Sequence, residues 1–201
     1  MNKRKYTIVQ ILPALNTGGV ERGVVEISKV LVENNFRSIV ISSGVYMVYQ
    51  ITRNGGIHYA LDVHTKNPLK WPKIRNQLKI ILESENIDLI HFCSRVPAWI
   101  GIPLGIALDI PIITSVHMRF RKANFLKKYY NSILTKGNSI IAISKHIEES
   151  IRFSFPQVSN KIKIIHRGVD LSLFNPSKIN PEGIIAQSKL LNLKDNIPVI
   201  I

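Results

Sequence analysis

The chain has 201 residues, of which 45% are hydrophobic and 20% charged, and its 27 Lys and Arg against 13 Asp and Glu give a formal net charge of +14. This length suits about one domain of common size, and the apolar content excludes a disordered chain. The single cysteine, Cys93, excludes a disulfide scaffold and indicates a reducing compartment. No apolar run reaches the roughly 18–20 residues of a membrane span. The sequence therefore predicts a soluble, basic, intracellular protein.

Short runs rich in β-branched residues recur along the chain and are almost continuously apolar. Such runs are typical of parallel strands whose two faces are both covered by helices. The predicted strands are residues 6–12, 38–42, 58–61, 89–92, 112–116, 139–143 and 162–165.

Between these runs, apolar residues recur at the spacing of one face of a helix. Strand and helix alternate from the first run to the last, which predicts right-handed βαβ units. The fold class is therefore α/β, with a doubly wound, mostly parallel, Rossmann-like sheet. The regularly spaced residues are Val20, Val24, Ile27 and Leu31, then Ile74, Leu78, Ile81 and Leu82, then Leu126, Tyr130, Ile133 and Leu134.

The last quarter of the chain departs from this pattern. A polar helix is predicted at residues 181–192, where a proline suits the first turn, and residues 197–201 open a new apolar strand. A buried parallel strand needs neighbours on both edges, so this strand is either an edge strand of the first sheet or the start of a second domain. The second interpretation predicts one domain at residues 1–175. It assigns residues 176–201 to a linker helix and the first strand of a missing C-terminal domain.

Ligands of an open α/β sheet bind outside the carboxyl ends of its strands, so the loops after the strands form the candidate site. Residues 16–22, with the sequence NTGGVER, follow the first strand and open directly into a helix. The paired Gly18 and Gly19 expose backbone N–H groups at a helix N-terminus, which attracts phosphate. Their spacing matches neither the dinucleotide fingerprint nor the P-loop. The alternative is a plain tight turn capped by Thr17.

Further loops deliver polar side chains to the same edge of the sheet. Arg95 follows the fourth strand and either binds a phosphate or carboxylate or is an ordinary surface arginine. His117 ends the fifth strand and is either catalytic or structural. Ser144 is a natural N-cap for a helix predicted at residues 145–153. Arg167 and Gly168, after the seventh strand, place a cation beside an open backbone.

Several familiar sites are missing from the sequence. The six histidines and one cysteine show no metal-ligand spacing, so no metal site is expected. There is no G-x-S-x-G nucleophile elbow and no obvious carboxylate pair of a glycoside hydrolase. Cys93 is predicted to be a small core residue at a strand end.

A cluster of basic and aromatic residues follows His117. Such a cluster suits an anionic lipid headgroup or a phosphorylated glycan. The alternative is a solvated helix whose aromatic rings pack inward. Nucleic acid is a third partner for a basic protein, and the lack of a recognition motif disfavours it. The cluster comprises Arg119, Phe120, Arg121, Lys122, Phe125, Lys127, Lys128, Tyr129 and Tyr130.

Taken together, the loops resemble those of family 4 glycosyltransferases, and more narrowly those of bacterial members that build lipopolysaccharide cores or other envelope glycans. The resemblance runs in order along nearly the whole chain. It rests on residues 12–22 (LPALNTGGVER), 93–99 (CSRVPAW), the strand that ends in His117, 141–144 (IAIS), and 165–170 (IHRGVD) with Phe174.

This resemblance implies the GT-B arrangement, in which two Rossmann-like domains face each other and the N-terminal one mainly holds the acceptor. It implies that Gly18 and Gly19 approach the diphosphate or sugar of the donor, and that His117 is the catalytic residue beside the transferred sugar. By the same analogy Arg95 shapes the acceptor side. The resemblance also places Glu21, Arg22, Ser144, Arg167 and Gly168 on the acceptor side or rim, and Asp170 and Phe174 near the hinge.

Members of this family retain anomeric configuration and need no metal, so no cofactor is expected and the nucleotide-sugar is a substrate. Two positions depart from the family pattern. Met118 stands where a small residue usually follows the histidine, and Pro103 lies inside the helix expected after Trp99. A proline there is expected to kink or end that helix. The donor-binding motifs of the family's second domain fall beyond residue 201.

These observations leave three hypotheses. The chain is the acceptor-side domain of a hexosyltransferase, inactive alone, which uses a nucleoside-diphosphate sugar, a glycan or lipid-linked acceptor and a separate C-terminal half. Alternatively, it is a decayed or non-catalytic fragment, or a basic nucleotide- or nucleic-acid-binding α/β module. The first hypothesis predicts a cytoplasmic protein in peripheral contact with the inner face of an anionic membrane.

Overall fold

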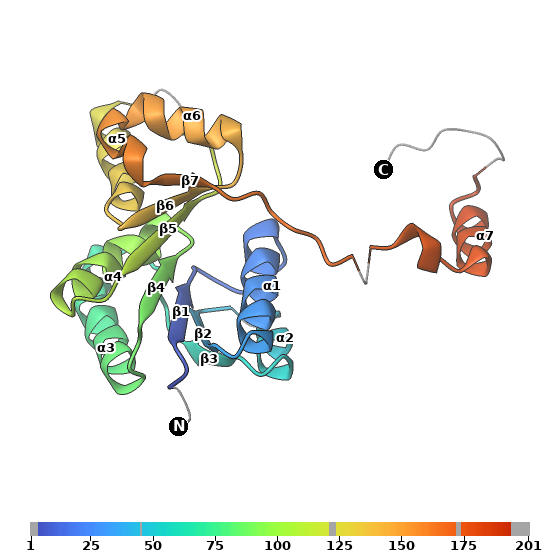
Figure 1. Ribbon diagram of the computed structural model, residues 1–201, viewed down its shortest axis with the longest axis horizontal. Helices are drawn as coiled ribbons and strands as arrows, with labels where there is room; N and C mark the ends of the chain where they lie inside the picture. Colours follow the sequence, from blue (N-terminus) through green and yellow to red (C-terminus); the bar gives the residue numbers. More distant parts are fainter. Residues whose placement is uncertain (1–3, 45, 121–123, 172–173, 194–201) are drawn as a thin grey trace. The chain divides into compact units, whose positions relative to one another are not determined.

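The structure, a computed structural model, describes residues 4–44, 46–120, 124–171 and 174–193. The chain divides into two compact units, Met1–Arg167 and Gly168–Ile201. Strands and helices alternate through the first unit, as the apolar runs predict (Figure 1).

The centre of the first unit is a seven-stranded sheet with the order β3-β2-β1-β4-β5-β6-β7. Every described pair of neighbouring strands is parallel. The predicted strands are confirmed, because each observed end lies within one residue of its prediction. The direction of winding changes between β1 and β4, which is where ligands bind in folds of this kind. The strands are β1 (Thr7–Ile11), β2 (Arg37–Ser42), β3 (Ile57–Ala60), β4 (Leu89–Phe92), β5 (Ile112–Val116), β6 (Ser139–Ala142) and β7 (Ile162–Ile164).

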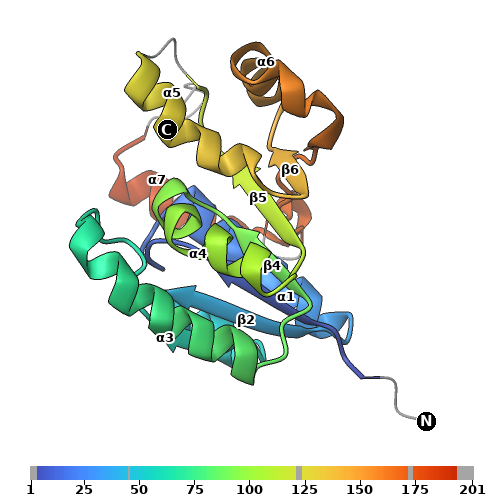
Figure 2. The same cartoon turned by 90° about the vertical axis from the view of Figure 1, so that its left-hand side faces the viewer.

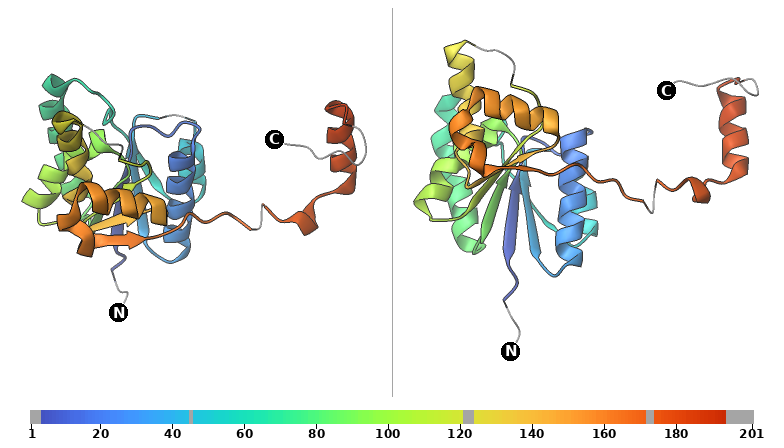
Figure 3. Two further views of the ribbon diagram at one scale, coloured as in Figure 1. Left: turned by 90° about the horizontal axis from the view of Figure 1, so that it is seen from above. Right: turned by 45° about the horizontal axis from the view of Figure 1, so that its top comes forward.

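Helices cover both faces of the sheet, as Figures 2 and 3 show. One face carries α1 (Gly19–Glu33) and α2 (Val48–Arg53). The opposite face carries α3 (Trp71–Ser84), α4 (Arg95–Ala107) and α6 (Lys145–Ser154), whose apolar residues share one core. The short α5 (Phe125–Ser132) follows β5. No helix in the described ranges is both long enough and apolar enough to cross a membrane.

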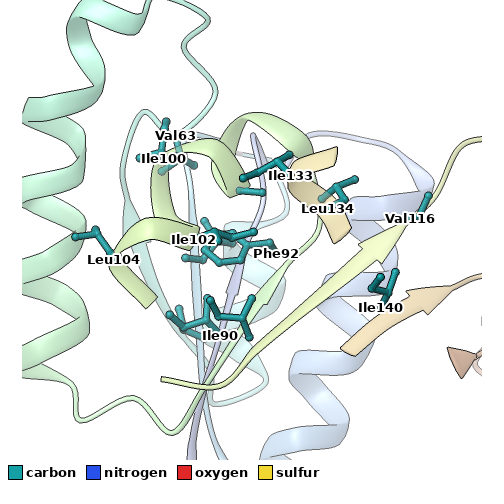
Figure 4. Packing of buried hydrophobic residues seen from close by; sticks show 14 of the residues in the cluster. Val63, Ile90, Phe92, Ile100, Ile102, Leu104, Val116, Ile133, Leu134 and Ile140 are labelled. Atoms are coloured by element: carbon teal, nitrogen blue, oxygen red, sulfur yellow. The ribbon is translucent and has the colours of Figure 1, made fainter. Parts of the chain in front are cut away.

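The two faces of the sheet differ in polarity. Toward α3 and α4 the strands present an apolar surface, and Phe92 packs so closely on α4 that a Cβ at Gly101 would lie 2.6 Å from its ring. Side chains alternate along a strand, so Gln10 and His91, which are paired in register, point to the opposite face. Figure 4 shows the apolar side, with Val63, Ile90, Phe92, Ile100, Ile102, Leu104, Val116, Ile133, Leu134 and Ile140.

Two of the predicted apolar stripes are partly wrong. In α1, Val24 is buried but Ile27 is exposed. The predicted third stripe begins on α5 at Leu126, which is exposed, and ends in a separate 3-10 turn, Ile133–Thr135, which is buried. A 3-10 turn tightens the chain and rotates the following side chains away from the helical stripe. Only the C-terminal part of this segment therefore enters the core.

Pro103 was expected to kink or end its helix; it does not end it, because α4 continues to Ala107. Proline lacks the N–H that would bond to the carbonyl of Trp99 and crowds the turn before it. Arg75 of α3 supplies replacement donors. Its Nε donates to the carbonyl of Ile100 at 3.0 Å and its Nη2 to that of Trp99 at 3.4 Å. The interior proline is thus accommodated by a side chain from the neighbouring helix.

The second unit contains a 3-10 turn, Pro176–Lys178, and the helix α7 (Pro181–Leu190), which confirms the predicted polar helix. The side chain of Asn180 caps α7 by accepting a hydrogen bond from the backbone N–H of Glu182 at 3.0 Å. The strand predicted at residues 197–201 lies outside the described residues. The domain boundary after residue 175, and the choice between an edge strand and a second domain, therefore stay predictions.

Candidate functional site

Three loops at the carboxyl edge of the sheet bring Gly19, His117 and Arg167 together; we call these residues the rim cluster. The Nη2 of Arg167 lies 3.1 Å from the Nδ1 of His117. Its Nη1 lies beside Gly19, only 2.5 Å from where a Cβ on that residue would be. The loops after β1, β5 and β7 thus converge, as the sequence predicts for residues that follow parallel strands.

His117 is neutral and its protonation pattern is fixed by its partner. A guanidinium has only donors, so the Nδ1 of His117 accepts and the ring proton lies on Nε2. Burial and, to a smaller extent, the charge of Arg167 lower the pKa of His117 to about 4. Nε2 is buried and has no hydrogen-bond partner among the described residues. The rim cluster therefore holds an N–H donor with no acceptor in the described part of the chain.

Further polar groups lie on the same face of the sheet. His91 Nε2 and Ser115 Oγ are 2.6 Å apart, and burial, with repulsion from His117, lowers the pKa of His91 to about 4. Cys93 is buried, and burial raises the pKa of its thiol to about 12. Since a thiol nucleophile must be a thiolate, Cys93 is a core residue, as predicted.

Arg95, the first residue of α4, is not an ordinary surface arginine. Its guanidinium carbon lies 5.9 Å from the centre of the Phe120 ring, within the range of a cation–π contact. Its Nε is buried without a partner within the described parts of the chain. Arg95 thus faces the segment that follows His117 and retains an unused donor.

The start of α1 differs from the capped-turn alternative. Its N-cap residue is Gly18, not Thr17, and no side chain caps the helix from that position. The carboxylate of Glu21 occupies the space beside Gly18, where a Cβ would lie 2.4 Å from its Oε2. The Nη1 of Arg22 donates to the Oε1 of Gln50 at 3.3 Å, which holds Arg22 against α2. Glu21 therefore lies at the helix N-terminus, and Arg22 bonds to α2.

The other predicted rim and hinge residues have local roles or belong to the second unit. The Oγ of Ser144 accepts a hydrogen bond from the backbone N–H of Ile147 at 3.3 Å, which confirms Ser144 as the N-cap of α6. Gly168, Asp170 and Phe174 belong to the second unit. Their assignment to the rim and the hinge stays a prediction.

The basic and aromatic segment after His117 divides between core and surface. Phe120 is buried, packs edge-on against Phe155, and exchanges backbone hydrogen bonds with the Ser150 hydroxyl. The inward-packing alternative is therefore right for Phe120. It is wrong for α5, where Phe125 is 81% exposed and Tyr129 is 59% exposed. Arg121 and Lys122 lie outside the described residues.

We call Phe125, Leu126, Lys127, Lys128 and Tyr129 the α5 surface, since all five side chains are exposed. α4 anchors this helix from one side. The indole N–H of Trp99 donates to the carbonyl of Tyr130 at 3.1 Å, and its ring lies 5.2 Å from that of Tyr129. The Nζ of Lys128 lies 5.8 Å from the centre of the Phe155 ring. Together the exposed residues form an apolar and basic surface.

The sequence analysis missed Gln10, which is fully buried and has no hydrogen-bond partner for either amide atom in the described part of the chain. Its signal was available, because an amide inside a nearly continuous apolar strand must find a partner or remain costly. The hydrogen-bonded pair of His91 and Ser115 was also missed, although both are polar residues inside apolar strands and carry the same signal. Within the described ranges, no three His, Cys, Asp or Glu side chains gather closely enough to hold a metal ion.

Comparison with known proteins supplies the family. Residues 17–173 match the profile of Glycosyltransferase Family 4. Spore coat protein SA of Bacillus subtilis is 28% identical over 136 residues, which cover 67% of this chain and 34% of that protein. A glycosyltransferase from Rickettsia africae superposes with a TM-score of 0.84 at 31% identity, covering 98% of this chain and 52% of the other.

A more distant structure shares the fold. Anabaena Alr3699/HepE, solved in complex with UDP-glucose, has a TM-score of 0.74 and 16% identity; the match covers 94% of this chain and 50% of that one. The chain thus spans about half the length of these solved structures. The family match at residues 17–173 includes all three residues of the rim cluster and covers most of the sequence. The chain therefore belongs to Glycosyltransferase Family 4, with the fold of the N-terminal half of its GT-B enzymes.

Proposed function

We propose that this chain is the acceptor-side half of an enzyme that transfers a hexose from a nucleoside-diphosphate sugar to a hydroxyl of a glycan or lipid-linked acceptor. The observation that carries the proposal is the buried Nε2–H of His117 at the ligand-binding edge of the sheet, which has no acceptor among the residues that the structure describes. A buried donor without a partner costs about 1–3 kcal/mol. A sugar hydroxyl supplies the missing acceptor, so binding recovers that cost.

Such a transfer also requires groups that stabilise the negative charge that grows on the departing diphosphate. Fixed N–H groups and cations lower the barrier when they face this growing charge. On this side of the site the donors are Arg167 and the N-terminus of α1 at Gly18 and Gly19. The Glu21 carboxylate beside Gly18 must move aside as the diphosphate approaches. Closure of the site then excludes water and favours transfer over hydrolysis.

The Anabaena protein of the same fold was solved with UDP-glucose, which supports a nucleotide-hexose as the donor class. The resemblance of the loops to envelope-glycan enzymes supports a cytoplasmic role in lipopolysaccharide or related synthesis. A nucleotide-sugar-binding half completes the enzyme in this proposal, and we expect the 201-residue chain to show no transfer alone. A decayed fragment predicts that no such partner restores activity.

A chimera tests the proposal. The 201-residue chain is fused to the part of the Rickettsia africae glycosyltransferase that it does not match, and incubated with labelled nucleotide-hexoses and bacterial lipid extract. We expect transfer by the chimera and none by either part alone. Turnover by the isolated chain contradicts the half-enzyme proposal. A chimera that binds nucleotide-sugar but transfers no hexose supports a non-catalytic fragment.

We also propose that the α5 surface contacts an anionic membrane, which would bring a lipid-linked acceptor to the site. Phe125 and Leu126 are 81% and 73% exposed, and two lysines lie beside them on the same helix. Exposed apolar side chains with adjacent cations are typical of helices that lie in a membrane interface. With 27 Lys and Arg against 13 Asp and Glu, the whole chain has the charge for such a partner.

A further inference from the structure

We infer that Arg167 is a positioning residue that fixes His117 in the tautomer with its proton on Nε2, and that residue 19 is glycine because the guanidinium occupies the space of a side chain there. This inference deepens the proposed function, on which it rests for the purpose of the Nε2 proton. In this inference the three residues depend on one another: Gly19 leaves room for the Arg167 guanidinium, and Arg167 sets the tautomer of His117.

The tautomer follows from the donor inventory. Arg167 Nη2 lies 3.1 Å from His117 Nδ1, and a guanidinium cannot accept a hydrogen bond. A neutral imidazole carries one proton, so the proton must lie on Nε2 while this bond persists. Without it, the two tautomers of an imidazole compete. Arg167 therefore makes His117 a hydrogen-bond donor through Nε2 and prevents it from acting there as a base.

The surrounding groups keep the ring neutral. Among the described residues, the charge of Arg167 after β7 lowers the pKa of His117 and opposes the raised pKa of the buried Cys93, while His117 lowers the pKa of His91 on β4. The Glu21 carboxylate lies beside Gly18, next to the rim cluster. Burial and the guanidinium together hold the pKa of His117 near 4, against an ordinary value of 6.5. The neutral Nε2–H tautomer therefore persists across the neutral pH range.

Gly19 provides the room for this arrangement. A Cβ at residue 19 would lie 2.5 Å from the Nη1 of Arg167, so an alanine there must displace the guanidinium. The same helix contains a matched control, because a Cβ at Gly23 would meet nothing within 4 Å. Backbone exposure to phosphate is one reason for a glycine at residue 19, and space for Arg167 is a second, independent one.

Histidine NMR tests the inference on the 201-residue chain without any sugar transfer. The chain is labelled with 15N-histidine, and the His117 ring signals are assigned from their loss in His117→Asn. In the native chain we expect one neutral tautomer, protonated on Nε2, and titration near pH 4. In Arg167→Ala we expect a mixture of tautomers and a pKa that rises only part of the way toward 6.5, because burial, the larger cause of the lowered pKa, remains. Arg167→Lys, which keeps a donor, restores most of the native pattern.

Gly19→Ala and Gly23→Ala complete the design. We expect Gly19→Ala to shift the His117 signals in the direction of Arg167→Ala, and Gly23→Ala to leave them unchanged. Circular dichroism checks that each variant is folded. If Arg167→Ala unfolds, the His117 signals of Gly19→Ala and Arg167→Lys test the inference in its place. An unchanged tautomer and pKa in the folded Arg167 or Gly19 variants overturns the inference. The NMR result is independent of catalysis, so it stands or fails separately from the transfer assay of the chimera.

Discussion

His91 and His117 show how burial at a single residue becomes a property of the whole chain. Both rings have a pKa of about 4 in the folded chain against 6.5 for an ordinary histidine. Between these values the unfolded chain binds more protons than the folded one, so the free energy of unfolding falls as pH decreases through this window. Above about pH 7 both rings are neutral in either state and the penalty disappears.

We therefore predict that urea unfolding at pH 4.5 gives a lower stability than at pH 7, by about 2 kcal/mol for each of the two rings. His91→Gln removes one titrating ring while keeping an amide that can bond to Ser115. This variant should lose roughly half of the pH dependence attributed to the pair. A native chain equally stable at both pH values would show that these rings are not buried in their neutral form.

For single residues, the sequence predicted the roles that depend on nearby residues in the chain. Ser144 caps a helix and Cys93 fills the core because each role depends on neighbouring residues or on strand position. The contact between Arg167 and His117 joins positions 50 apart. The sequence places both at the same sheet edge, but the tautomer depends on which two atoms meet. The close approach of Arg167 to Gly19 involves a third loop, the one after β1.

Among the elements, α4 depends on its neighbour α3. Pro103 leaves the carbonyl of Trp99 without its helical donor, and Arg75 bonds to that carbonyl and to the next. We predict that Arg75→Ala lowers the free energy of unfolding by about 1–3 kcal/mol, because it removes donors from half-buried carbonyls. In Pro103→Ala, the restored N–H reduces the need for Arg75, so the same substitution should cost less.

A double-mutant cycle measures this coupling by urea unfolding of the native chain, both single variants and the double variant. We expect a coupling energy of about 0.5–2 kcal/mol, typical of groups that share a partner. Additive costs within about 0.3 kcal/mol would show that Arg75 acts independently of the proline.

The strands were predictable, since a parallel strand covered on both faces is apolar at almost every position. The helices were less predictable, and the physical reason differs between α4 and α5. Pro103 was expected to kink or end α4. The Arg75 side chain that bonds to the freed carbonyl lies on a different helix, so the local spacing of residues does not reveal it. The apolar spacing from Leu126 to Leu134 suggested one stripe, but the 3-10 turn at Ile133–Thr135 separates an exposed helix from a buried turn.

For the whole molecule, the α5 surface and the net charge of +14 make anionic membranes the partner to test. We predict that the chain sediments with phosphatidylglycerol-containing vesicles, more weakly as salt increases, and little with phosphatidylcholine alone. Lys127→Gln with Lys128→Gln should weaken binding about 30-fold, at about 1 kcal/mol for each lysine. Phe125→Ser with Leu126→Ser should also weaken it, through lost apolar burial.

Ile106→Ser is the matched control, because Ile106 is exposed on α4 and not part of the α5 surface. It should leave vesicle binding unchanged. Equal affinity for neutral vesicles, or full binding by the α5 variants, would contradict membrane contact through this surface. Preferential binding of DNA by the native chain would instead favour the nucleic-acid alternative.

The family and half of a GT-B fold could be inferred from the order of loops along the chain, because those loops occupy fixed places on a doubly wound sheet. In the proposed enzyme, the specific reaction depends on groups of a second, nucleotide-sugar-binding half and of the substrates. The proposed reaction depends most on His117, since its Nε2–H has no acceptor within the described residues.

The most direct test is therefore the rate of hexose transfer by the chimera with His117 and with His117→Ala, at saturating donor and acceptor. If the Nε2–H meets the sugar at the reacting centre, removal of this donor lowers kcat by about 10²–10³-fold, while circular dichroism shows the variant to be folded and vesicle binding stays unchanged. A His117→Ala chimera that transfers hexose at the native rate would contradict the central claim that His117 acts on the transferred sugar.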